Sequence, residues 1–514
     1  MENLILLASL NLLTMISRKV IAVALLISIC ATGVTGQSKD YFKKSTPEAR
    51  GIPSESILEF VNALEEEIDA VHSFMILRHG KLVSQGWWDP YGPELPHLMH
   101  SLSKSFTSTA IGLAVEENLL SLDSLVISFF PDKVPGDLSW QWKEMRIRDL
   151  LTMNTGHLEE PRPGPDQDDW VMYFLSSEVE LMPGTHFRYN SMATYMCSAI
   201  IQVVSGEKLV DYLGSRLFQP LGIQKPEWDE CPAGINTGGW GLHIRTEDIA
   251  KLGQLYLQKG LWEGERILTE EWVDMATSKQ VSNGSNPDND WTQGYGFQFW
   301  RCRHYCYRGD GAFGQFCIVM PEQEAVIAIT SGTNDMGGVM QLIWNILLPA
   351  MKDGVLPENP PALSLLEKKT RSLALPVIKG ESHSSMSKKI SGKRYTMDAN
   401  PAGINAVSFE LHQGDHSMKM ETDSGSFILR IGSGAYEKSE TELLLPAGVP
   451  GLAKIAASGA WVTDNDYTLR IYFNGAPARV TYHFDFKENE MKWSAKLEHS
   501  LFGPREPIEM TGTM

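Results

Sequence analysis

The sequence predicts an α/β fold in which an antiparallel sheet is flanked by helices and interrupted by an inserted helical subdomain, followed by a C-terminal all-β domain. Strand-like apolar runs joined by tight turns occur at 74–87 and again, far downstream, at 314–330. Between them the chain has mostly helical periodicity and loops. Alternating apolar and polar residues return after residue 391. We therefore expect one sheet built from two distant parts of the chain, and a separate β-domain behind it.

Length and composition are those of a folded, acidic protein with more than one domain. The chain has 514 residues, of which 43% are hydrophobic, so it can bury a full core. Its formal net charge of −18 argues against a nucleic-acid partner and against broad attraction to anionic membranes.

The N-terminal segment has the pattern of a secretory signal. Two basic residues precede an apolar run at 20–29, and small residues follow it. The apolar run is short for a transmembrane helix. We expect residues 1–36 to be a signal peptide, with translation starting at Met1 or Met15, and the mature protein to be exported. A membrane anchor formed by an uncleaved segment is the alternative.

The first predicted domain spans residues 37–352. A hairpin around Gly80 opens it, and an apolar-faced helix begins near Ser101. The remaining elements expected from periodicity and turn residues are helices at 148–151, 194–204, 246–258 and 336–351 and strands at 314–320 and 325–330.

A linker and a β-domain are expected after it. Residues 353–390 are rich in Pro, Ser and Lys, which is typical of a linker, here with one short helix. Residues 391–514 are predicted to form an accessory barrel or sandwich without catalytic groups. Its strands are expected at 407–411, 426–431, 441–445, 467–473, 479–486 and 491–497.

The cysteines do not describe a disulfide framework. Five remain beyond the signal segment, and an odd number cannot all pair. Cys302 and Cys306 could form one bridge, or bind a metal together with His304. Because no second ligand pair with zinc-site spacing exists, we expect no metal.

Ser101 and Lys104 form an S-x-x-K pair at the start of a strongly helical segment. Residues three apart lie on one face of a helix, so hydroxyl and amine can meet. A lysine shielded from water can lose its proton near neutral pH and act as a base. Ser385 and Lys388 have the same spacing, but they lie in the Ser- and Lys-rich stretch. We therefore place the nucleophile at Ser101 and the base at Lys104.

Tyr189 belongs to a second motif, the segment 183–191, which contains a Pro-Gly turn and precedes a helix. A tyrosine close to a lysine cation can approach a phenolate and shuttle protons. Asn190 and Ser191 follow it, either as site residues or as plain turn residues.

A third motif, at 308–315, opens the downstream hairpin strand with several glycines. Glycines allow a substrate to lie against a strand edge, where a backbone N–H can complete an oxyanion hole. The candidate substrate-binding residues here are Arg308, Gly309, Gly311 and Ala312.

Together these motifs resemble the serine β-lactamase and penicillin-binding-protein superfamily, in particular the branch with class C β-lactamases, D-alanyl-D-alanine carboxypeptidases, β-lactamase-fold esterases and aminohexanoate-dimer hydrolases. The run Leu-Leu-Thr-Met-Asn-Thr-Gly at 150–156 is similar as well, and the likeness extends over residues 45–350. The resemblance implies the β-lactamase/DD-peptidase-like fold and acylation of Ser101. It also implies proton handling by Lys104 and Tyr189, with Ser191 in the third place of a Y-x-N/S motif.

Two departures from that superfamily bear on the substrate. Ser191 stands where β-lactamases usually have Asn, and the run 308–311 replaces K-T-G. The cation that anchors a β-lactam carboxylate is therefore missing or replaced by Arg308. A loop glutamate, Glu159 or Glu160, is an alternative general base.

The sequence thus predicts a serine hydrolase that cleaves a small ester, amide or peptide through an acyl-enzyme on Ser101, with no metal or organic cofactor. A D-amino-acid peptidase or a β-lactamase is the alternative among enzymes. A non-catalytic, penicillin-binding-like scaffold is the alternative of another class. The presence of Ser101, Lys104 and Tyr189 together argues against that scaffold.

Overall fold

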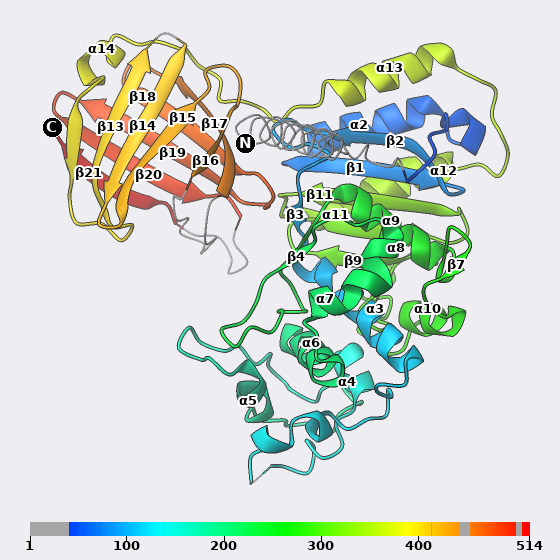
Figure 1. The fold of residues 1–514 in the computed structure, drawn as a ribbon. Helices are drawn as coiled ribbons and strands as arrows, with labels where there is room; N and C mark the ends of the chain where they lie inside the picture. The colour runs from blue at the N-terminus through cyan, green and yellow to red at the C-terminus, as the bar shows by residue number, and fades with distance from the viewer. Residues whose placement is uncertain (1–40, 137, 413, 442–452, 500–505) are drawn as a thin grey trace, which may run out of the picture. The chain divides into compact units, whose positions relative to one another are not determined.

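A computed structural model describes residues 41–514, except for 137, 413, 442–452 and 500–505 (Figure 1). The expected signal peptide lies outside the described residues. The described residues from Lys44 to Met514 belong to one compact unit. None of the helices in the described part is long and apolar enough to span a membrane.

A six-stranded antiparallel sheet forms the centre of the first domain, in the order β2-β1-β11-β10-β9-β8. β1 pairs with β11, with Phe74 opposite Ile329, so the upstream and downstream hairpins join in mid-sheet. This confirms the predicted α/β fold with its antiparallel sheet. The strands are β1 (Val71–Arg78), β2 (Lys81–Trp87), β8 (Trp300–Arg301), β9 (Tyr307–Gly311), β10 (Gln315–Met320) and β11 (Ala325–Ser331).

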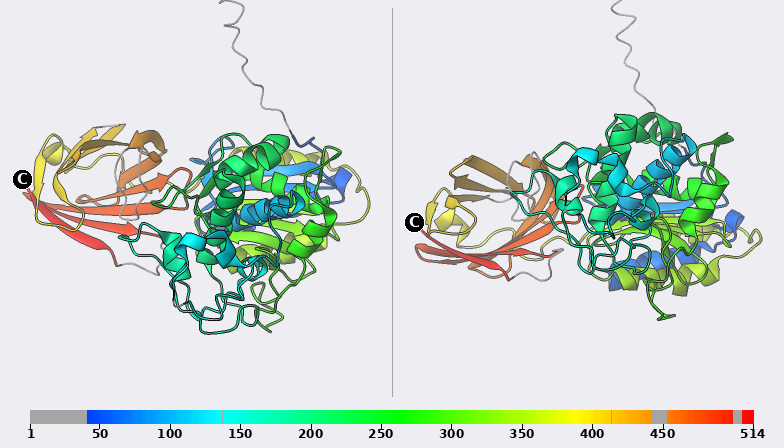
Figure 2. Two further views of the ribbon diagram at one scale, coloured as in Figure 1. Left: turned by 60° about the horizontal axis from the view of Figure 1, so that its bottom comes forward. Right: turned by 90° about the horizontal axis from the view of Figure 1, so that it is seen from below.

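Helices cover both faces of this sheet (Figures 1 and 2). Residues of α2 (Ser54–Glu67) share one core with alternate residues of the strands, including Phe74 and Ile329. α9 (Thr246–Leu257) packs on the opposite face. A Cβ at Gly253 of α9 would lie 2.5 Å from Val326 Cγ1, so glycine lets this helix approach the sheet closely. The helical run after β11 comprises α11 (Met336–Leu342), the π-helical turn η6 (Ile343–Leu347) and α12 (Leu348–Ala350).

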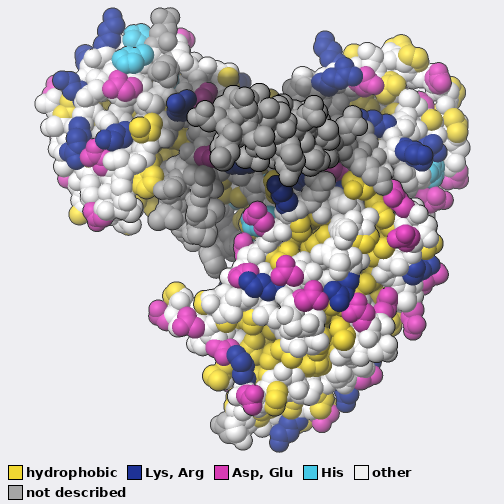
Figure 3. Space-filling view, in the orientation of Figure 1, with side chains coloured by type: hydrophobic (Ala, Val, Ile, Leu, Met, Phe, Trp, Pro, Cys, Tyr) yellow, Lys and Arg dark blue, Asp and Glu magenta, His cyan; other side chains and the backbone are white. Residues whose placement is uncertain are grey.

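The inserted subdomain lies between β2 and β8 along the chain. The face of the molecule drawn in Figure 3 carries interspersed basic and acidic side chains, with hydrophobic side chains gathered over this insertion. A short helix, η1 (Glu48–Arg50), precedes α2. The helices of the inserted subdomain are η2 (His100–Leu102), α3 (Ser103–Glu116), η3 (Val126–Phe129), η4 (Pro131–Lys133), α4 (Ile147–Leu151), α5 (Trp170–Leu175), α6 (Ser191–Ser205), α7 (Leu209–Leu213), the π-helical turn η5 (Gly214–Phe218), α8 (Gln219–Leu221) and α10 (Glu270–Thr277). Its short strands are β3 (His97–Leu98), β4 (Glu227–Trp228), β5 (Leu242–Ile244), β6 (Leu261–Trp262) and β7 (Glu265–Arg266).

Helix α3 is buried along nearly its whole length, although six of its 14 residues are Ser, Thr or Lys. The hydroxyls are satisfied inside the protein. Ser105 donates to the Gln298 carbonyl at 3.1 Å, and Ser108 donates to the Phe297 carbonyl at 2.7 Å. Buried polar groups that are hydrogen-bonded make a core more rigid and do not destabilise it. α3 is therefore a fixed support for the residues at its N-terminus.

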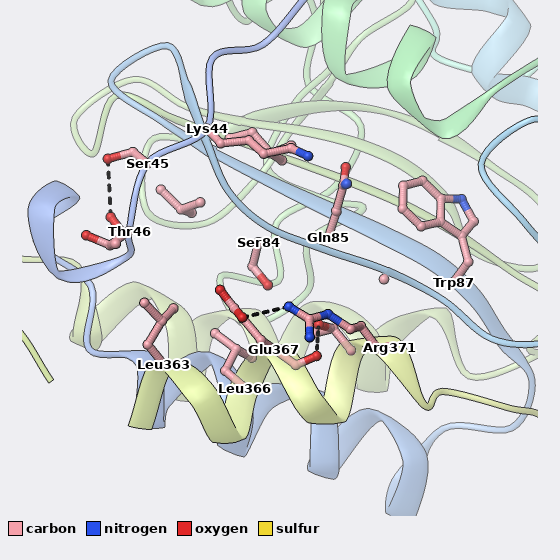
Figure 4. Close-up of a pocket in the computed structure, with 14 residues that line it drawn as sticks. Lys44, Ser45, Thr46, Ser84, Gln85, Trp87, Leu363, Leu366, Glu367 and Arg371 are labelled. Carbon is pink, nitrogen blue, oxygen red and sulfur yellow. Dashed lines mark hydrogen bonds and ion pairs between the residues drawn. The ribbon is translucent and has the colours of Figure 1, made fainter. Parts of the chain in front are cut away.

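The first part of the segment expected to be a linker is packed against the first domain, whereas its later part pairs with the barrel, with Glu381 opposite Trp461. Helix α13 (Pro360–Arg371) lies against α2, and its Leu366 belongs to the core between α2 and the sheet. A groove of about 580 Å³ separates α13 from the edge strand β2, with Leu363 and Arg371 on one wall and Gln85 on the other (Figure 4). A boundary at residue 352 would thus remove a helix that completes the first domain's core.

The C-terminal domain is a ten-stranded antiparallel sheet whose strands follow one another in sequence around the domain. β12 pairs with β21, and Gly459 N donates to the Gly432 carbonyl at 3.0 Å, so the sheet curls toward closure as a barrel. The predicted all-β domain is confirmed, while residues 442–445 of one expected strand lie outside the described residues. A short helix, α14 (Ser387–Ile390), precedes the strands. They are β12 (Arg394–Met397), β13 (Ile404–His412), β14 (Asp415–Thr422), β15 (Gly425–Ile431), β16 (Glu437–Thr441), β17 (Ala453–Trp461), β18 (Asp466–Phe473), β19 (Arg479–Lys487), β20 (Glu490–Leu497) and β21 (Ile508–Thr513).

Specific contacts join the barrel to the first domain within the unit Lys44–Met514. Arg479 forms two hydrogen bonds with the Asp69 carboxylate, at 3.0 and 2.7 Å. Tyr91 donates to the Ala476 carbonyl at 3.2 Å, and Tyr472 of β18 packs into the core of the first domain. The barrel is therefore in direct contact with the first domain.

Candidate active site

Ser101 lies in η2, immediately before α3, and its side chain is partly exposed. The turn is held from both sides, because Ser103 Oγ donates to the His100 carbonyl at 2.7 Å and accepts from Leu242 N at 3.1 Å. His100 has a φ of 45°, an uncommon value for a residue other than glycine. Surrounding structure fixes this strained turn, so the position of the Ser101 hydroxyl is set before substrate arrives.

Lys104 is 2% exposed and reaches three oxygen atoms with its amine. Nζ lies 3.2 Å from Ser101 Oγ, 3.1 Å from Ser191 Oγ and 2.6 Å from the carbonyl oxygen of Gly239. Burial lowers the pKa of Lys104 to about 7, although Glu160 and Asp310 act in the opposite direction. A large fraction of Lys104 is therefore neutral near physiological pH.

The neutral amine fits these three oxygens. It has two N–H donors and one lone pair, and the Gly239 carbonyl can only accept. One N–H therefore goes to Gly239, and the other is available for Ser191 Oγ. The lone pair can then accept the Ser101 hydroxyl proton, which is the arrangement that general-base activation of Ser101 requires.

Tyr189 faces the same pair from the loop before α6. Its ring stacks on Trp300, with centroids 5.5 Å apart, and Lys104 Nζ lies 5.0 Å from the ring centre. Burial is the main cause that raises the pKa of Tyr189 well above its usual value; Asp310 adds to the rise, and a hydrogen bond to Ser101 opposes it. The tyrosine therefore keeps its proton, so the phenolate expected from the sequence is not the resting form.

The segment 150–156 supports the tyrosine loop from behind. Arg188 N donates to the Met153 carbonyl at 2.9 Å, and Asn190 Nδ2 donates to Thr155 Oγ1 at 3.3 Å. Gly156 has a φ of 85°, and a Cβ there would lie 2.3 Å from the Leu181 carbonyl oxygen. This glycine allows the tight turn on which the loop rests.

Asn190 and Ser191 have different roles at the start of α6. Asn190 is the N-cap, and its side chain accepts from Ala193 N at 3.1 Å. Ser191 turns its hydroxyl toward Lys104 instead. The backbone N–H of Ser191 donates to Glu160 Oε1 at 2.5 Å. Glu160 therefore binds the helix N-terminus, where a carboxylate is favoured, and this carboxylate is directed to Ser191 N instead of Ser101.

Glu159, the other alternative base, is turned away from the site. Its side chain is 84% exposed and pairs with Arg188 at 2.6 Å. Neither loop glutamate has a hydrogen bond to Ser101, and Lys104 is the basic group that does.

The third motif lies on β9, where the Arg308 side chain points away from solvent. Arg308 is fully buried and pairs with the Asp310 carboxylate at 2.8 Å. Its guanidinium lies 4.5 Å from the Trp291 ring centre and donates to the Asp290 carbonyl at 2.9 Å. The structure thus encloses and neutralises the cation that the sequence offered as a carboxylate anchor, and Arg308 is not free to bind a substrate anion.

The glycines of β9 let this strand pack against the nucleophile's turn. A Cβ at Gly309 would lie 2.5 Å from Ser105 Oγ, and one at Gly311 would lie 2.0 Å from the Met99 carbonyl oxygen. Both side-chain positions are therefore filled by the protein itself. Ala312, directly after β9, is partly exposed and lies at the strand end nearest this turn.

Gly239 and Trp300 are parts of the site that the sequence did not point to. Gly239 supplies the carbonyl that holds Lys104, and a Cβ there would lie 2.7 Å from the Ser191 carbonyl oxygen. The run Gly-Gly-Trp-Gly at 238–241 is the signal that could have drawn attention to this loop. Trp300 orients Tyr189 by stacking, but a single tryptophan in a loop-rich region carries no such signal.

The second S-x-x-K match is not a comparable site. Ser385 and Lys388 are both exposed, beside the short helix α14, whereas Lys104 is buried. Cys302 and Cys306 are free thiols, and burial raises the pKa of Cys302 to about 11. Across the described ranges no group of three or more His, Cys, Asp or Glu side chains could hold a metal ion.

A sheet with a helical insertion, a serine and a buried lysine one turn apart, and a tyrosine facing both define the serine β-lactamase and penicillin-binding-protein superfamily. Residues 61–348, more than half of the chain, match the family Beta-lactamase, and the chain belongs to that family.

Its relatives include a dimer hydrolase and an aminopeptidase. The chain is 21% identical over 319 residues to 6-aminohexanoate-dimer hydrolase of Paenarthrobacter ureafaciens, which covers 57% of this chain and 80% of that protein. It is 27% identical over 175 residues to D-aminopeptidase of Brucella anthropi, which covers 30% and 34%. A solved structure from Bacillus anthracis, assigned as a 6-aminohexanoate-dimer hydrolase, superposes with a TM-score of 0.51 at 19% identity over 62% of this chain and 89% of that one. The named relatives support hydrolase activity, and the solved structure supports the fold.

Proposed function

We propose that this protein is a serine hydrolase that cleaves an ester or amide bond through an acyl-enzyme on Ser101. The observation that carries the proposal is the buried Lys104 amine, 3.2 Å from Ser101 Oγ, with a pKa lowered to about 7. A base with a pKa close to the working pH combines a useful neutral fraction with proton affinity.

In the acylation step, Lys104 takes the Ser101 proton while Oγ forms a bond to the substrate's carbonyl carbon. The bond from that carbon to the leaving oxygen or nitrogen then breaks. The proton on Lys104 passes to the leaving atom, and the protonated Tyr189 hydroxyl is placed beside Ser101 to relay it. The backbone N–H groups of Ser101 and Ala312 are the proposed donors to the oxyanion.

Deacylation follows by the reverse path. A water molecule takes the place of the leaving group, gives one proton to Lys104 and attacks the acyl carbon. The acyl–oxygen bond to Ser101 breaks, and the proton returns to Ser101 Oγ, which restores the starting state. Atoms balance over the cycle: one water is consumed, and one acid and one alcohol or amine are released.

The burial of Arg308 favours esters and amides over β-lactam antibiotics as substrates. Arg308 is paired with Asp310, so no cation on β9 is left to hold a carboxylate beside the reacting carbonyl. A D-amino-acid peptidase or β-lactamase activity remains the alternative. These activities are distinguished by measuring the turnover of p-nitrophenyl esters, nitrocefin, D-alanyl peptides and aminohexanoate oligomers by the purified protein. If none of these substrates is turned over, the protein is a non-catalytic scaffold.

The covalent step has a direct test. An alkyl fluorophosphonate should add once to the wild-type chain, because it reacts with activated serines and mimics the tetrahedral intermediate. Intact-mass measurement shows the stoichiometry, and peptide mapping locates the adduct. We expect it on Ser101. An adduct on Ser385, which has the same tetrapeptide spacing in an exposed position, would contradict the assignment.

Tyr189→Phe is expected to lower kcat by about two to four orders of magnitude, which is the usual contribution of a positioned proton donor. The phenylalanine ring can keep the stacking on Trp300, so the loop should retain its shape. The measurement is kcat and KM for a p-nitrophenyl ester between pH 5 and 9, compared with wild type on the same substrate. Wild-type rates at every pH would give Tyr189 a structural role only.

A further inference from the structure

Three rings from separate parts of the chain gather beside the nucleophile. The His100 ring packs edge-on against Phe313 with centroids 5.4 Å apart, and Phe313 lies 5.7 Å from the ring of His499. His100 precedes Ser101, Phe313 lies in the β9–β10 turn, and His499 follows β20 of the C-terminal barrel. We call these three side chains the His100–Phe313–His499 cluster.

The cluster borders both parts of the proposed reaction centre. His100 is bonded directly to Ser101, and Phe313 directly to Ala312, the proposed oxyanion donor that follows β9. The Gly311 backbone packs against the Met99 carbonyl, which fixes the turn of Phe313 beside that of Ser101. The cluster is therefore attached through the backbone to both the nucleophile and the proposed oxyanion donor.

The imidazoles in this cluster have unused hydrogen-bonding atoms. His499 is only 7% exposed, yet neither of its ring nitrogens has a partner among the described residues. His100 Nε2 is buried without a partner as well. Leaving a buried polar atom unpaired costs free energy, so native proteins rarely keep several such atoms close together without a use. A ligand group in contact with the cluster would satisfy them.

The charged side chains around His499 are paired with one another. Arg479 near His499 is paired with Asp69, and Lys496 is paired with Glu498 at 3.1 Å. Burial, followed by the Arg479 charge, lowers the pKa of His499 to about 4. At neutral pH the ring is therefore uncharged, with one N–H donor and one nitrogen acceptor. These surroundings suit a neutral group better than a carboxylate or an ammonium.

We propose that the His100–Phe313–His499 cluster is a substrate subsite for a neutral aromatic or similarly flat apolar group that carries a hydrogen-bonding oxygen. His499 is the specificity-determining residue, contributed by the C-terminal barrel. The flat faces of Phe313 and the imidazoles contact the apolar body, and an imidazole N–H donates to the oxygen. This inference rests on the proposed hydrolase function and assigns the barrel a part in substrate choice, with all reacting groups still on the first domain.

The test compares substrates that differ only at the group in question. p-Nitrophenyl acetate, phenylacetate and (4-acetamidophenyl)acetate share one leaving group and add first a ring and then a hydrogen-bonding amide. Phenyl acetate and 4-acetamidophenyl acetate make the second comparison on the leaving-group side. Ratios of kcat/KM within each series, each divided by the ratio for hydroxide hydrolysis, isolate the contribution of the subsite from intrinsic reactivity.

Two substitutions of His499 distinguish the contribution of its apolar ring from that of its hydrogen-bonding nitrogens. His499→Ala should lower the preference for phenylacetate over acetate about tenfold, as expected for the loss of one face of an apolar pocket. His499→Phe should keep that preference but lose about tenfold in the preference for the acetamido ester, because one hydrogen bond is lost. His412→Ala is the matched control, an exposed histidine of the same barrel, and should leave every ratio at its wild-type value.

The outcomes distinguish this inference from the proposed function. If the fluorophosphonate adduct forms on Ser101 but both His499 variants keep wild-type ratios in both series, the subsite is overturned and the hydrolase stands. If no adduct forms, the hydrolase itself has failed. If the ratios change in just one of the two series, the subsite is supported, and that series identifies whether the acyl group or the leaving group binds there. Thermal unfolding of each variant checks folding, and His499→Phe decides the question if the alanine variant does not fold.

Discussion

Ser101→Ala is expected to abolish turnover, with kcat falling by about four to six orders of magnitude. Without Oγ no acyl-enzyme can form, and Lys104 loses the group it activates. The fold should persist, because Ser101 is partly exposed and its hydroxyl bonds to two other side chains of the site, Lys104 at 3.2 Å and Tyr189. We expect the free energy of unfolding to change by no more than about 1 kcal/mol.

The measurement is burst and steady-state release of p-nitrophenol, with circular dichroism to follow the fold. Ser385→Ala is the matched control, since it removes the same atom from the same tetrapeptide in an exposed position. It should be indistinguishable from wild type. Residual turnover above about one percent in Ser101→Ala, at an intact fold, would place the nucleophile elsewhere.

The fold was predictable because its signals are local. The hairpin of β1 and β2 and that of β10 and β11 each have turn residues and apolar runs, and pairing β1 with β11 buries both. The S-x-x-K spacing places Ser101 and Lys104 within one helical turn whatever the rest of the chain does. The proximity of Tyr189, by contrast, came from the resemblance to a family and not from spacing.

The parts that sequence reasoning missed depend on contacts between distant residues. The Gly239 carbonyl reaches Lys104 across 135 positions of the chain, and the glycine run at 238–241 marks the loop without indicating that contact. The burial of Arg308 follows from Asp310, Trp291 and the strand fold around them, so its charge was wrongly read as available. The protonated state of Tyr189 likewise follows from desolvation, which outweighs the nearby hydroxyl and could not be judged before the loop was placed.

The C-terminal part illustrates the same limit. Pro- and Ser-rich composition was a fair sign of a linker, but Leu366 in α13 completes a core formed by residues some 300 positions earlier. Composition indicates how a segment behaves in isolation, but it does not indicate which surface of the folded protein the segment packs against. For this reason the contact of the barrel residue His499 with Phe313, on which the proposed subsite depends, has no counterpart in the sequence.

Lys104→Arg is expected to lower kcat/KM by about two to four orders of magnitude, the range that general-base catalysis contributes. Arginine keeps its positive charge at every working pH, so it cannot take the Ser101 proton. Lys104→Met removes the charge and approximates the volume of the side chain, and it should be equally impaired although it leaves the site uncharged. Comparing Lys104→Arg with Lys104→Met therefore distinguishes the loss of the general base from a disturbance of the site by the larger arginine cation. Lys388→Arg, in the exposed tetrapeptide, is the matched control and should keep wild-type activity.

The pH profile gives the second half of this expectation. Burial lowers the pKa of Lys104 to about 7, and only its neutral form is a base. Wild-type kcat/KM should therefore rise about tenfold per pH unit below this value and level off above it. The free energy of unfolding should also increase with pH through this range. A lysine whose pKa is lowered on folding takes up a proton when the protein unfolds. Its destabilising contribution is therefore largest below pH 7 and disappears as the pH rises through the ordinary lysine pKa of 10.5. Lys104→Met should lose the inflection near pH 7 both in the residual rate and in the pH dependence of unfolding. An inflection that persists in kcat/KM of Lys104→Met would assign it to another group and leave Lys104 with a positioning role, since its three hydrogen bonds to Ser101, Ser191 and Gly239 would then explain any loss of rate.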